Sequence, residues 1–166
     1  MSFAVWLTGL PACGKSAIAR ELVGLLESRG VHAARLESDV MRTQLTPFPR
    51  YDDADRDFFY STLGEIGALL VEKQKAVVFD ATANRRAYRD AARKRIARFA
   101  EVFVDTPLEV CVARDPKGLY RKGMKIAYEP PAAPELVLPG DQGTPQESAA
   151  RIVSLLESRG WLSAAA

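Results

Sequence analysis

The sequence predicts an α/β domain of three layers, in which helices cover both faces of a parallel sheet. Short apolar runs alternate along the chain with longer segments whose apolar residues recur at helical spacing. The runs are continuous rather than alternating with polar residues, as in strands that are buried on both faces. A glycine-rich turn joins the first run to the first helical segment. This order of elements is typical of a doubly covered parallel sheet.

Turn residues and caps set the boundaries of the expected elements. Pro47 and Pro49 interrupt the chain, Gly30 and Gly160 stand where helices stop, and Thr144 can cap the last helix. The predicted strands are residues 3–8, 32–36, 76–79, 102–104 and 136–138. The predicted helices are residues 16–29, 40–45, 53–72, 85–99, a segment that starts over 107–112, and 145–159.

Composition and charge narrow the class of protein. The chain has 166 residues, a formal net charge of +2 and two cysteines, which fits one globular domain over residues 1–166. The charge is too small to indicate a nucleic-acid or membrane-surface protein. Cys13 and Cys111 stand apart without a CxxC pattern and are interpreted as reduced thiols. Since no apolar stretch is long enough to span a bilayer and no basic leader precedes the first run, we expect a cytoplasmic protein.

The strongest motif is the glycine-rich turn, GLPACGKS at residues 9–16, which matches the phosphate-loop pattern GxxxxGK(S/T). Glycines at both ends let backbone amides approach a phosphate closely. The lysine of such a loop reaches the β and γ oxygens of ATP, and the serine hydroxyl ligates Mg²⁺. The predicted cofactors are therefore ATP and Mg²⁺, and the predicted nucleotide-binding residues are Gly9, Leu10, Pro11, Ala12, Cys13, Gly14, Lys15, Ser16 and Ala17.

A phosphate loop does not by itself choose between a kinase, a GTPase and a motor. The sequence contains no NKxD pattern of the kind that specifies guanine, and a chain of this length favours a small-molecule kinase of the P-loop type. We therefore expect a phosphotransferase with an alcohol acceptor. The irregular segment 117–134, rich in glycine, proline and lysine, is predicted to be its lid.

Acidic residues after two of the strands are candidates for the acceptor site, because ligands of such sheets bind beyond the carboxyl ends of the strands. Asp39 can orient an acceptor hydroxyl and take its proton, and it can also cap a helix. Asp80 can hold Mg²⁺ through water, or cap the end of its strand. Arg42 and Arg56 can each clamp a phosphate or sulfate group, or remain solvated on the surface.

The helix predicted over residues 85–99 is strongly basic. One interpretation is a solvated face, and the other is a track for a polyanion such as the end of a nucleic acid. Its cations are Arg85, Arg86, Arg89, Arg93, Lys94, Arg95 and Arg98.

Several stretches of the chain resemble adenylyl-sulfate kinases, which use ATP to phosphorylate the ribose 3′-hydroxyl of adenosine 5′-phosphosulfate. LESDVMR at residues 36–42 is similar to the family's LDGDNVR, and YDDADR at 51–56 to its FSxxDR. The most specific stretches are FVDTPLEVC at 103–111 and RDPKGLY at 114–120. With the opening strand and loop at 5–16, the resemblance covers most of the chain.

The resemblance implies roles for individual residues. Asp39 would be the catalytic carboxylate, acting with Lys15, and Arg42 and Arg56 would hold the phosphosulfate. Arg114 would lie by the nucleotide, and Lys117 would belong to a mobile lid. The family's fold, a parallel sheet with helices on both sides, agrees with the pattern of elements.

The chain also departs from the family pattern at three places. Phe59 and Ser61 stand where the family has an asparagine and an arginine that help to hold the substrate. The family's FTGID-like insert before Tyr128 is reduced to residues 125–127, so the lid is shortened. The family's ISPxR is replaced by DATANR at 80–85, which is more similar to polynucleotide kinases and small-molecule hydroxyl kinases.

The first hypothesis is therefore an adenylyl-sulfate kinase of sulfate assimilation. The alternative is a P-loop kinase for another hydroxyl, on a sugar, a polyol, another nucleotide or a polynucleotide 5′ end. A third possibility is a nucleotide-binding domain without catalysis. The expected partner is a small nucleotide substrate, not a membrane; a nucleic-acid partner is disfavoured, and a homodimer is possible.

Overall fold

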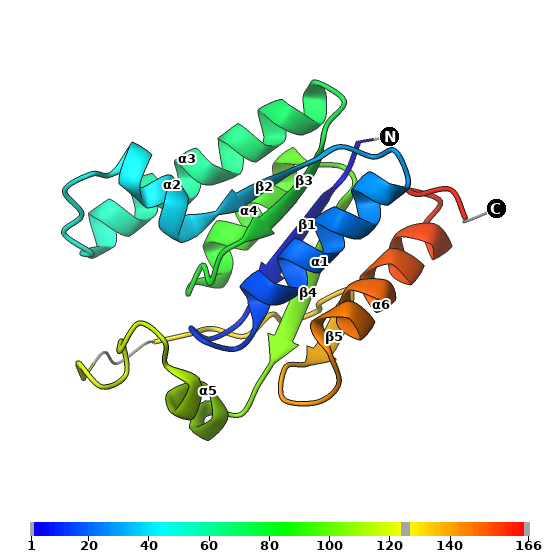
Figure 1. The fold of residues 1–166 in the computed structure, drawn as a ribbon. Helices are drawn as coiled ribbons and strands as arrows, with labels where there is room; N and C mark the ends of the chain where they lie inside the picture. Colours follow the sequence, from blue (N-terminus) through cyan, green and yellow to red (C-terminus); the bar gives the residue numbers. More distant parts are fainter. Residues whose placement is uncertain (1, 124–126, 165–166) are drawn as a thin grey trace.

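The computed structural model describes residues 2–123 and 127–164. Its centre is a five-stranded sheet in the order β2-β3-β1-β4-β5, in which every pair of neighbours is parallel (Figure 1). The strands are β1 (Ala4–Thr8), β2 (Ala33–Glu37), β3 (Ala76–Asp80), β4 (Phe99–Asp105) and β5 (Leu136–Pro139). The predicted α/β fold with a parallel sheet is confirmed.

Helices cover the sheet on both faces (Figure 1). The pair α1 and α6 packs together on one face, and α3 packs against α4 on the other. In the described residues the helices are α1 (Lys15–Ser28), α2 (Ser38–Leu45), α3 (Asp53–Glu72), α4 (Arg86–Arg95), α5 (Leu108–Arg114) and α6 (Pro145–Ser158). None of these helices is long and apolar enough to cross a membrane.

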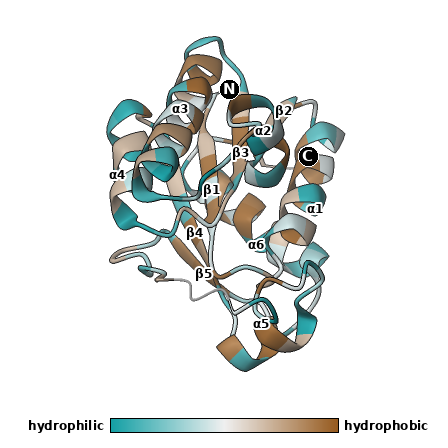
Figure 2. Ribbon diagram, turned by 90° about the vertical axis from the view of Figure 1, so that its left-hand side faces the viewer, coloured by the Kyte–Doolittle hydropathy of each residue, from teal (hydrophilic) through white to brown (hydrophobic). Residues whose placement is uncertain are grey.

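The sheet separates two hydrophobic cores. Val5 and Leu7 of β1 pack with α1 and α6, whereas Ala4 and Trp6 point to the opposite side, where the Trp6 ring stacks on Phe79. Successive side chains of a strand point to opposite faces, so a strand buried on both sides needs an uninterrupted apolar run. Figure 2 shows these apolar strands in the middle of the molecule, between the helical layers.

The helix predicted over residues 85–99 is shorter than expected. It ends at Arg95, Ile96 has an extended backbone, and β4 begins at Phe99, before the predicted start at residue 102. Phe99 pairs with Ala4 of β1, and the Ala4 amide donates to the Arg98 carbonyl at 2.8 Å. Pairing with the central strand therefore outweighs the local helical preference of this segment.

The predicted helix ends are confirmed where caps mark them. The Thr144 side chain accepts the Glu147 amide, Glu147 returns a hydrogen bond to the Thr144 amide, and Pro145 occupies the first turn of α6. Gly30 and Gly160 both adopt positive φ angles, 72° and 65°, directly after α1 and α6. Of the segment expected to form a lid, residues 124–126 lie outside the described residues.

Candidate active site

The phosphate loop connects β1 to α1 and is held closely against the sheet. A Cβ atom on Gly9 would lie 2.6 Å from the Val104 carbonyl oxygen, so only glycine fits there. Gly14, the N-cap of α1, has a φ of 105°, a conformation that side chains disfavour. The loop thus presents backbone amides at the N-terminus of a helix, an arrangement that binds phosphate groups.

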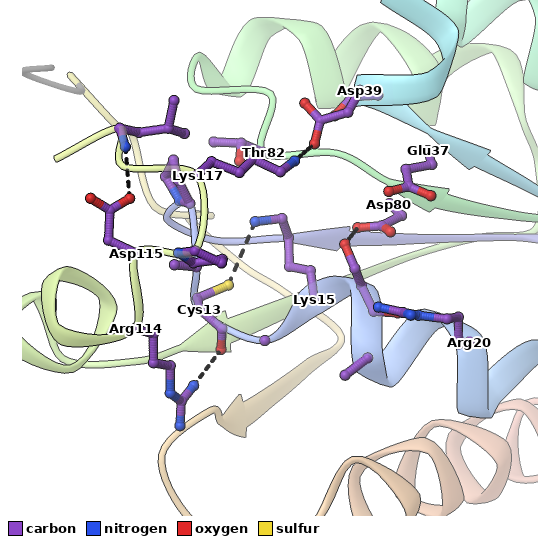
Figure 3. A pocket seen from close by; sticks show the side chains of 18 residues that line it. Cys13, Lys15, Arg20, Glu37, Asp39, Asp80, Thr82, Arg114, Asp115 and Lys117 are labelled. Carbon is purple, nitrogen blue, oxygen red and sulfur yellow. Dashed lines mark hydrogen bonds and ion pairs between the residues drawn. The ribbon is translucent and has the colours of Figure 1, made fainter. Parts of the chain in front are cut away.

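Lys15 lies inside this loop. The residue is only 8% exposed, and its Nζ donates to the carbonyl oxygens of Gly9 at 3.1 Å and Leu10 at 2.9 Å. The ammonium also lies 3.6 Å from Cys13 Sγ (Figure 3). An anion entering the loop therefore meets a cation that is already positioned.

A pocket of about 420 Å³ opens in front of the loop, at the carboxyl ends of β2 and β3 (Figure 3). It brings together most of the predicted site residues. Those that line it are residues 11–17, Asp39, Asp80, Arg114 and Lys117, and those that do not are Gly9, Leu10, Arg42 and Arg56. Gly9 and Leu10 contact the site through their carbonyl oxygens, which accept hydrogen bonds from Lys15 Nζ.

At the end of the pocket where Mg²⁺ is predicted, Ser16 Oγ donates to Asp80 Oδ1 at 3.2 Å. The Asp80 side chain is 2% exposed, and its other oxygen accepts from Arg35 Nη2 at 2.7 Å. Arg35 also pairs with Glu37 at 2.8 Å. A hydroxyl and a carboxylate side by side form a hard oxygen donor set, which fits the chemistry of Mg²⁺ beside a phosphate.

Across the pocket, Asp39 Oδ2 forms an ion pair with Lys117 Nζ (Figure 3). The two side chains are 60% and 57% exposed, and 78 residues separate them in sequence. Asp39 belongs to the first turn of α2, where an acidic side chain is favoured by the helix dipole. The prediction that Asp39 caps the helix is wrong, because α2 begins at Ser38 with Glu37 as its N-cap and without a side-chain cap hydrogen bond. The place of Asp39 at the pocket fits the acceptor-site interpretation.

Arg114 lies at the other end of the pocket. It donates to the Gly140 carbonyl at 2.8 Å and to the Cys13 carbonyl at 3.5 Å, while Thr106 Oγ1 donates to the same Cys13 oxygen at 2.8 Å. Gly140 fits closely there, because a Cβ atom on it would lie 1.8 Å from Thr106 Oγ1. Arg114 thus ties the phosphate loop to the loop that follows β5.

Arg42 and Arg56 lie outside the pocket. Arg42 packs its guanidinium over the Phe59 ring and pairs with Asp55 at 3.4 Å. Arg56 is half-buried in the first turns of α3.

Two of the residues that shape the site were not predicted. Asp115 is buried, and its carboxylate accepts the amides of Leu119, Tyr120 and Arg121, which fixes the turn that carries Lys117. Arg35 holds Asp80 from the neighbouring strand. Arg35 stands in no recognised motif, and although Asp115 belongs to the RDPKGLY stretch, local spacing does not reveal the contacts through which either residue acts.

In the described part of the chain, carboxylates pair with four of the seven cations of the basic segment, which disfavours its interpretation as a polyanion track. Arg89 is fully buried, so the solvated-face interpretation is wrong for this residue. Its Nε lies 2.9 Å from Glu101 Oε1, although the two atoms do not have hydrogen-bond geometry. The other cations of the segment with carboxylate partners are Arg85 with Asp53 and Asp57, Arg93 with Glu101 and Glu135, and Arg95 with Glu65 and Glu72.

A parallel sheet with a phosphate loop after its first strand, a buried lysine in that loop and acidic residues at the neighbouring strand ends define a nucleotide-binding protein of the P-loop class. The sequence model of the family described as adenylylsulphate kinase matches residues 1–139. The chain belongs to this family.

Relatives and solved structures agree with that assignment. The adenylyl-sulfate kinase of Halothermothrix orenii is 36% identical over 168 residues, covering 95% of this chain and 91% of its own. That of Citrobacter koseri is 41% identical over 150 residues, covering 83% and 75%. The structure of the Mycobacterium tuberculosis APS kinase CysC in complex with AMPPNP and APS superimposes with a TM-score of 0.87 at 34% identity, covering 94% of this chain and 98% of the other.

Proposed function

We propose that this protein transfers the γ-phosphoryl group of ATP to the 3′-hydroxyl of adenosine 5′-phosphosulfate (APS). The observation that supports this proposal most is that one pocket is lined both by residues 11–17 of the phosphate loop and by Asp39 (Figure 3). The similarity over 94% of the chain to an APS kinase whose structure contains AMPPNP and APS supports this choice of substrates.

The nucleotide end consists of residues 9–17. On binding, the phosphates of ATP would exchange with the carbonyl oxygens of Gly9 and Leu10 as partners of Lys15. The ammonium then stabilises the charge that develops on the β and γ oxygens during transfer. Arg114 would lie by the nucleotide, since it already bridges the loop and Gly140.

Ser16 and Asp80 would hold Mg²⁺ at the same end, the serine directly and the carboxylate through water. The metal supplies charge neutralisation on the phosphate oxygens. Arg35 keeps the Asp80 carboxylate facing the serine, because it holds the second carboxylate oxygen at 2.7 Å.

The acceptor end is built around Asp39. Its carboxylate would accept the proton of the attacking hydroxyl while the new O–P bond forms and the bond to the ADP oxygen breaks. Lys117, its partner in this structure, would then be free to contact phosphate oxygens. Arg42 and Arg56 would hold the phosphosulfate through their guanidinium groups.

The test follows terminal-phosphate label from ATP in the presence of Mg²⁺, with APS and a 5′-hydroxyl oligonucleotide as separate acceptors. Label is expected in 3′-phosphoadenosine 5′-phosphosulfate and not in the oligonucleotide, and Lys15→Ala should abolish it. Label in the oligonucleotide alone would contradict the proposal and favour end-phosphorylation. The cytoplasmic location expected from the sequence is tested by cell fractionation, and light scattering decides between a monomer and a homodimer, which the sequence left open.

A further inference from the structure

We propose that Phe59 is a positioning residue: it holds the Arg42 guanidinium in place for the anionic head group of the acceptor. This inference rests on the proposed function and adds to it the residue that orients the anion-binding arginine. Phe59 has no exposed surface, so it cannot touch a ligand and can act only through a neighbour.

The geometry around Arg42 is that of a cation stacked on aromatic rings. The guanidinium carbon lies 4.1 Å from the centroid of the Phe59 ring, within the range of a favourable cation–π contact. The rings of Tyr51 and Tyr60 lie farther away, at 5.1 and 5.7 Å. Phe59 is therefore the principal surface on which the guanidinium rests.

The hydrogen bonds of Arg42 leave most of its donors unused. Among the described residues, the side chain of Arg42 makes one hydrogen bond, from Nη1 to Asp55 Oδ2 at 3.4 Å. That oxygen also accepts the Tyr51 amide at 3.2 Å. A guanidinium carries five N–H donors, so most of them are left for a ligand, and the side chain is still 12% exposed.

The position of Arg42 on α2 connects it to the pocket. It follows Asp39 by three residues, and side chains at this spacing lie on the same face of a helix. Asp39 lines the pocket, whereas Arg42 lies one turn farther along. An acceptor whose hydroxyl meets Asp39 can therefore extend along α2 until an anionic group reaches Arg42.

The ligand expected there is a tetrahedral oxyanion, phosphate or sulfate, because the guanidinium fork binds two of its oxygens at once. A guanidinium held flat on a buried ring loses less rotational freedom on binding than a solvated one. The ring is itself fixed, since Phe59 packs edge-on against Tyr60 with centroids 5.1 Å apart. The buried rings beneath Arg42 thus pre-organise its guanidinium for the anion.

The test compares Phe59→Leu with the wild type. Leucine keeps an apolar side chain but has no ring face, so KM for APS is expected to rise about tenfold, while KM for ATP and kcat change less than about twofold. Leu63→Ala is the matched control: Leu63 is also fully buried, one turn farther along α3. That variant should lower the melting temperature without changing KM for APS.

A double-mutant cycle separates positioning from stability. Arg42→Ala alone should raise KM for APS, and adding Phe59→Leu should raise it no further, because the ring acts only through Arg42. An unchanged KM in Phe59→Leu, or an equal effect of this substitution in the Arg42→Ala background, would overturn the inference.

Calorimetric titration with APS distinguishes a failure of the inference about Phe59 from a failure of the proposed function. Wild-type protein that binds APS without turning it over would contradict the proposed activity, and the same variants would then be compared by Kd. Wild-type protein that does not bind APS would overturn both proposals.

Discussion

Asp39 is the residue on which the proposed chemistry depends most directly. In this structure it pairs with Lys117 at the mouth of the pocket, and both side chains are more than half exposed. Exposed ion pairs contribute less than about 1 kcal/mol to stability. Replacing the carboxylate therefore tests its chemical role with little effect on the fold.

Asp39→Asn should lower kcat for APS phosphorylation by about 100-fold or more, the usual contribution of a positioned general base. The Kd of an ATP analogue should change less than about twofold, because the phosphate loop is untouched. Steady-state kinetics and calorimetry measure the two quantities. Asp90→Asn, an exposed carboxylate on α4, is the control and should leave both unchanged. An unaltered kcat in Asp39→Asn would remove this carboxylate from the mechanism.

Among the elements, α3 packs closely against the sheet because a glycine, Gly67, faces β3. A Cβ atom on Gly67 would lie 2.0 Å from Cζ of Phe79 in β3. The Phe79 ring is fully buried and stacks on Trp6 with centroids 4.3 Å apart, so it has no room to move aside. The glycine sets the distance between α3 and β3.

Gly67→Ala should therefore destabilise the protein by about 1–3 kcal/mol, the usual cost of overpacking a core. The matched control is Gly24→Ala in α1, where a Cβ atom would meet nothing within 4 Å. The same substitution there should stabilise by about 0.5–1 kcal/mol, because alanine favours a helix. Urea denaturation checks both signs, and equal effects at the two positions would contradict this account of α3.

The elements also differ in how far local sequence predicts them. The bounds of α3, residues 53–72, agree with the prediction because Asp52 caps its start and the apolar spacing continues to its end. The predicted end of α4 is wrong, because residues 96–98 carry no local stop signal. The helix ends early because Phe99 pairs with Ala4 of β1 in the sheet. Local signals thus predict both ends of α3, whereas long-range pairing with β1 determines where α4 ends.

At the scale of the whole molecule, a buried network of charges joins segments that are distant in sequence. Arg89 of α4 donates to Thr8 at the end of β1 at 2.7 Å and lies 2.9 Å from Glu101 of β4. Arg93 holds Glu135 through bonds of 2.6 and 2.9 Å. The network thus connects the strand that leads into the phosphate loop with the segment that precedes β5.

The two carboxylates of this network respond to it differently. Burial raises the pKa of Glu101, although Arg89 and Arg93 oppose the change. Burial alone would also raise the pKa of Glu135, but the hydrogen bonds from Arg93 and from the Glu101 amide outweigh it and bring its pKa below the ordinary value of 4.5. Glu135 therefore stabilises the folded state in its charged form.

Glu135→Gln should lower the free energy of unfolding by about 2 kcal/mol at neutral pH, the scale of hydrogen bonds to a charged group. A depressed pKa contributes stability above the unfolded pKa, and this contribution is lost as pH falls through the folded pKa. The difference between wild type and variant should thus shrink below about pH 4.5. Urea titrations from pH 7 to pH 3 measure it. The exposed Glu109→Gln should show almost no difference at any pH, and a constant gap for Glu135→Gln would contradict the assigned ionisation.

The parallel α/β fold, the phosphate loop after the first strand, and the positions of Asp39 and Asp80 near the carboxyl ends of strands could all be predicted from the sequence. These features follow from neighbouring residues: strand burial appears as a continuous apolar run, and loop geometry as glycines at fixed spacing. The burial of Arg89, the stacking of Arg42 on Phe59 and the contact of Asp39 with Lys117 depend on how the elements pack. Each of these joins different elements, and local spacing carries no information about which distant side chains will share a buried position.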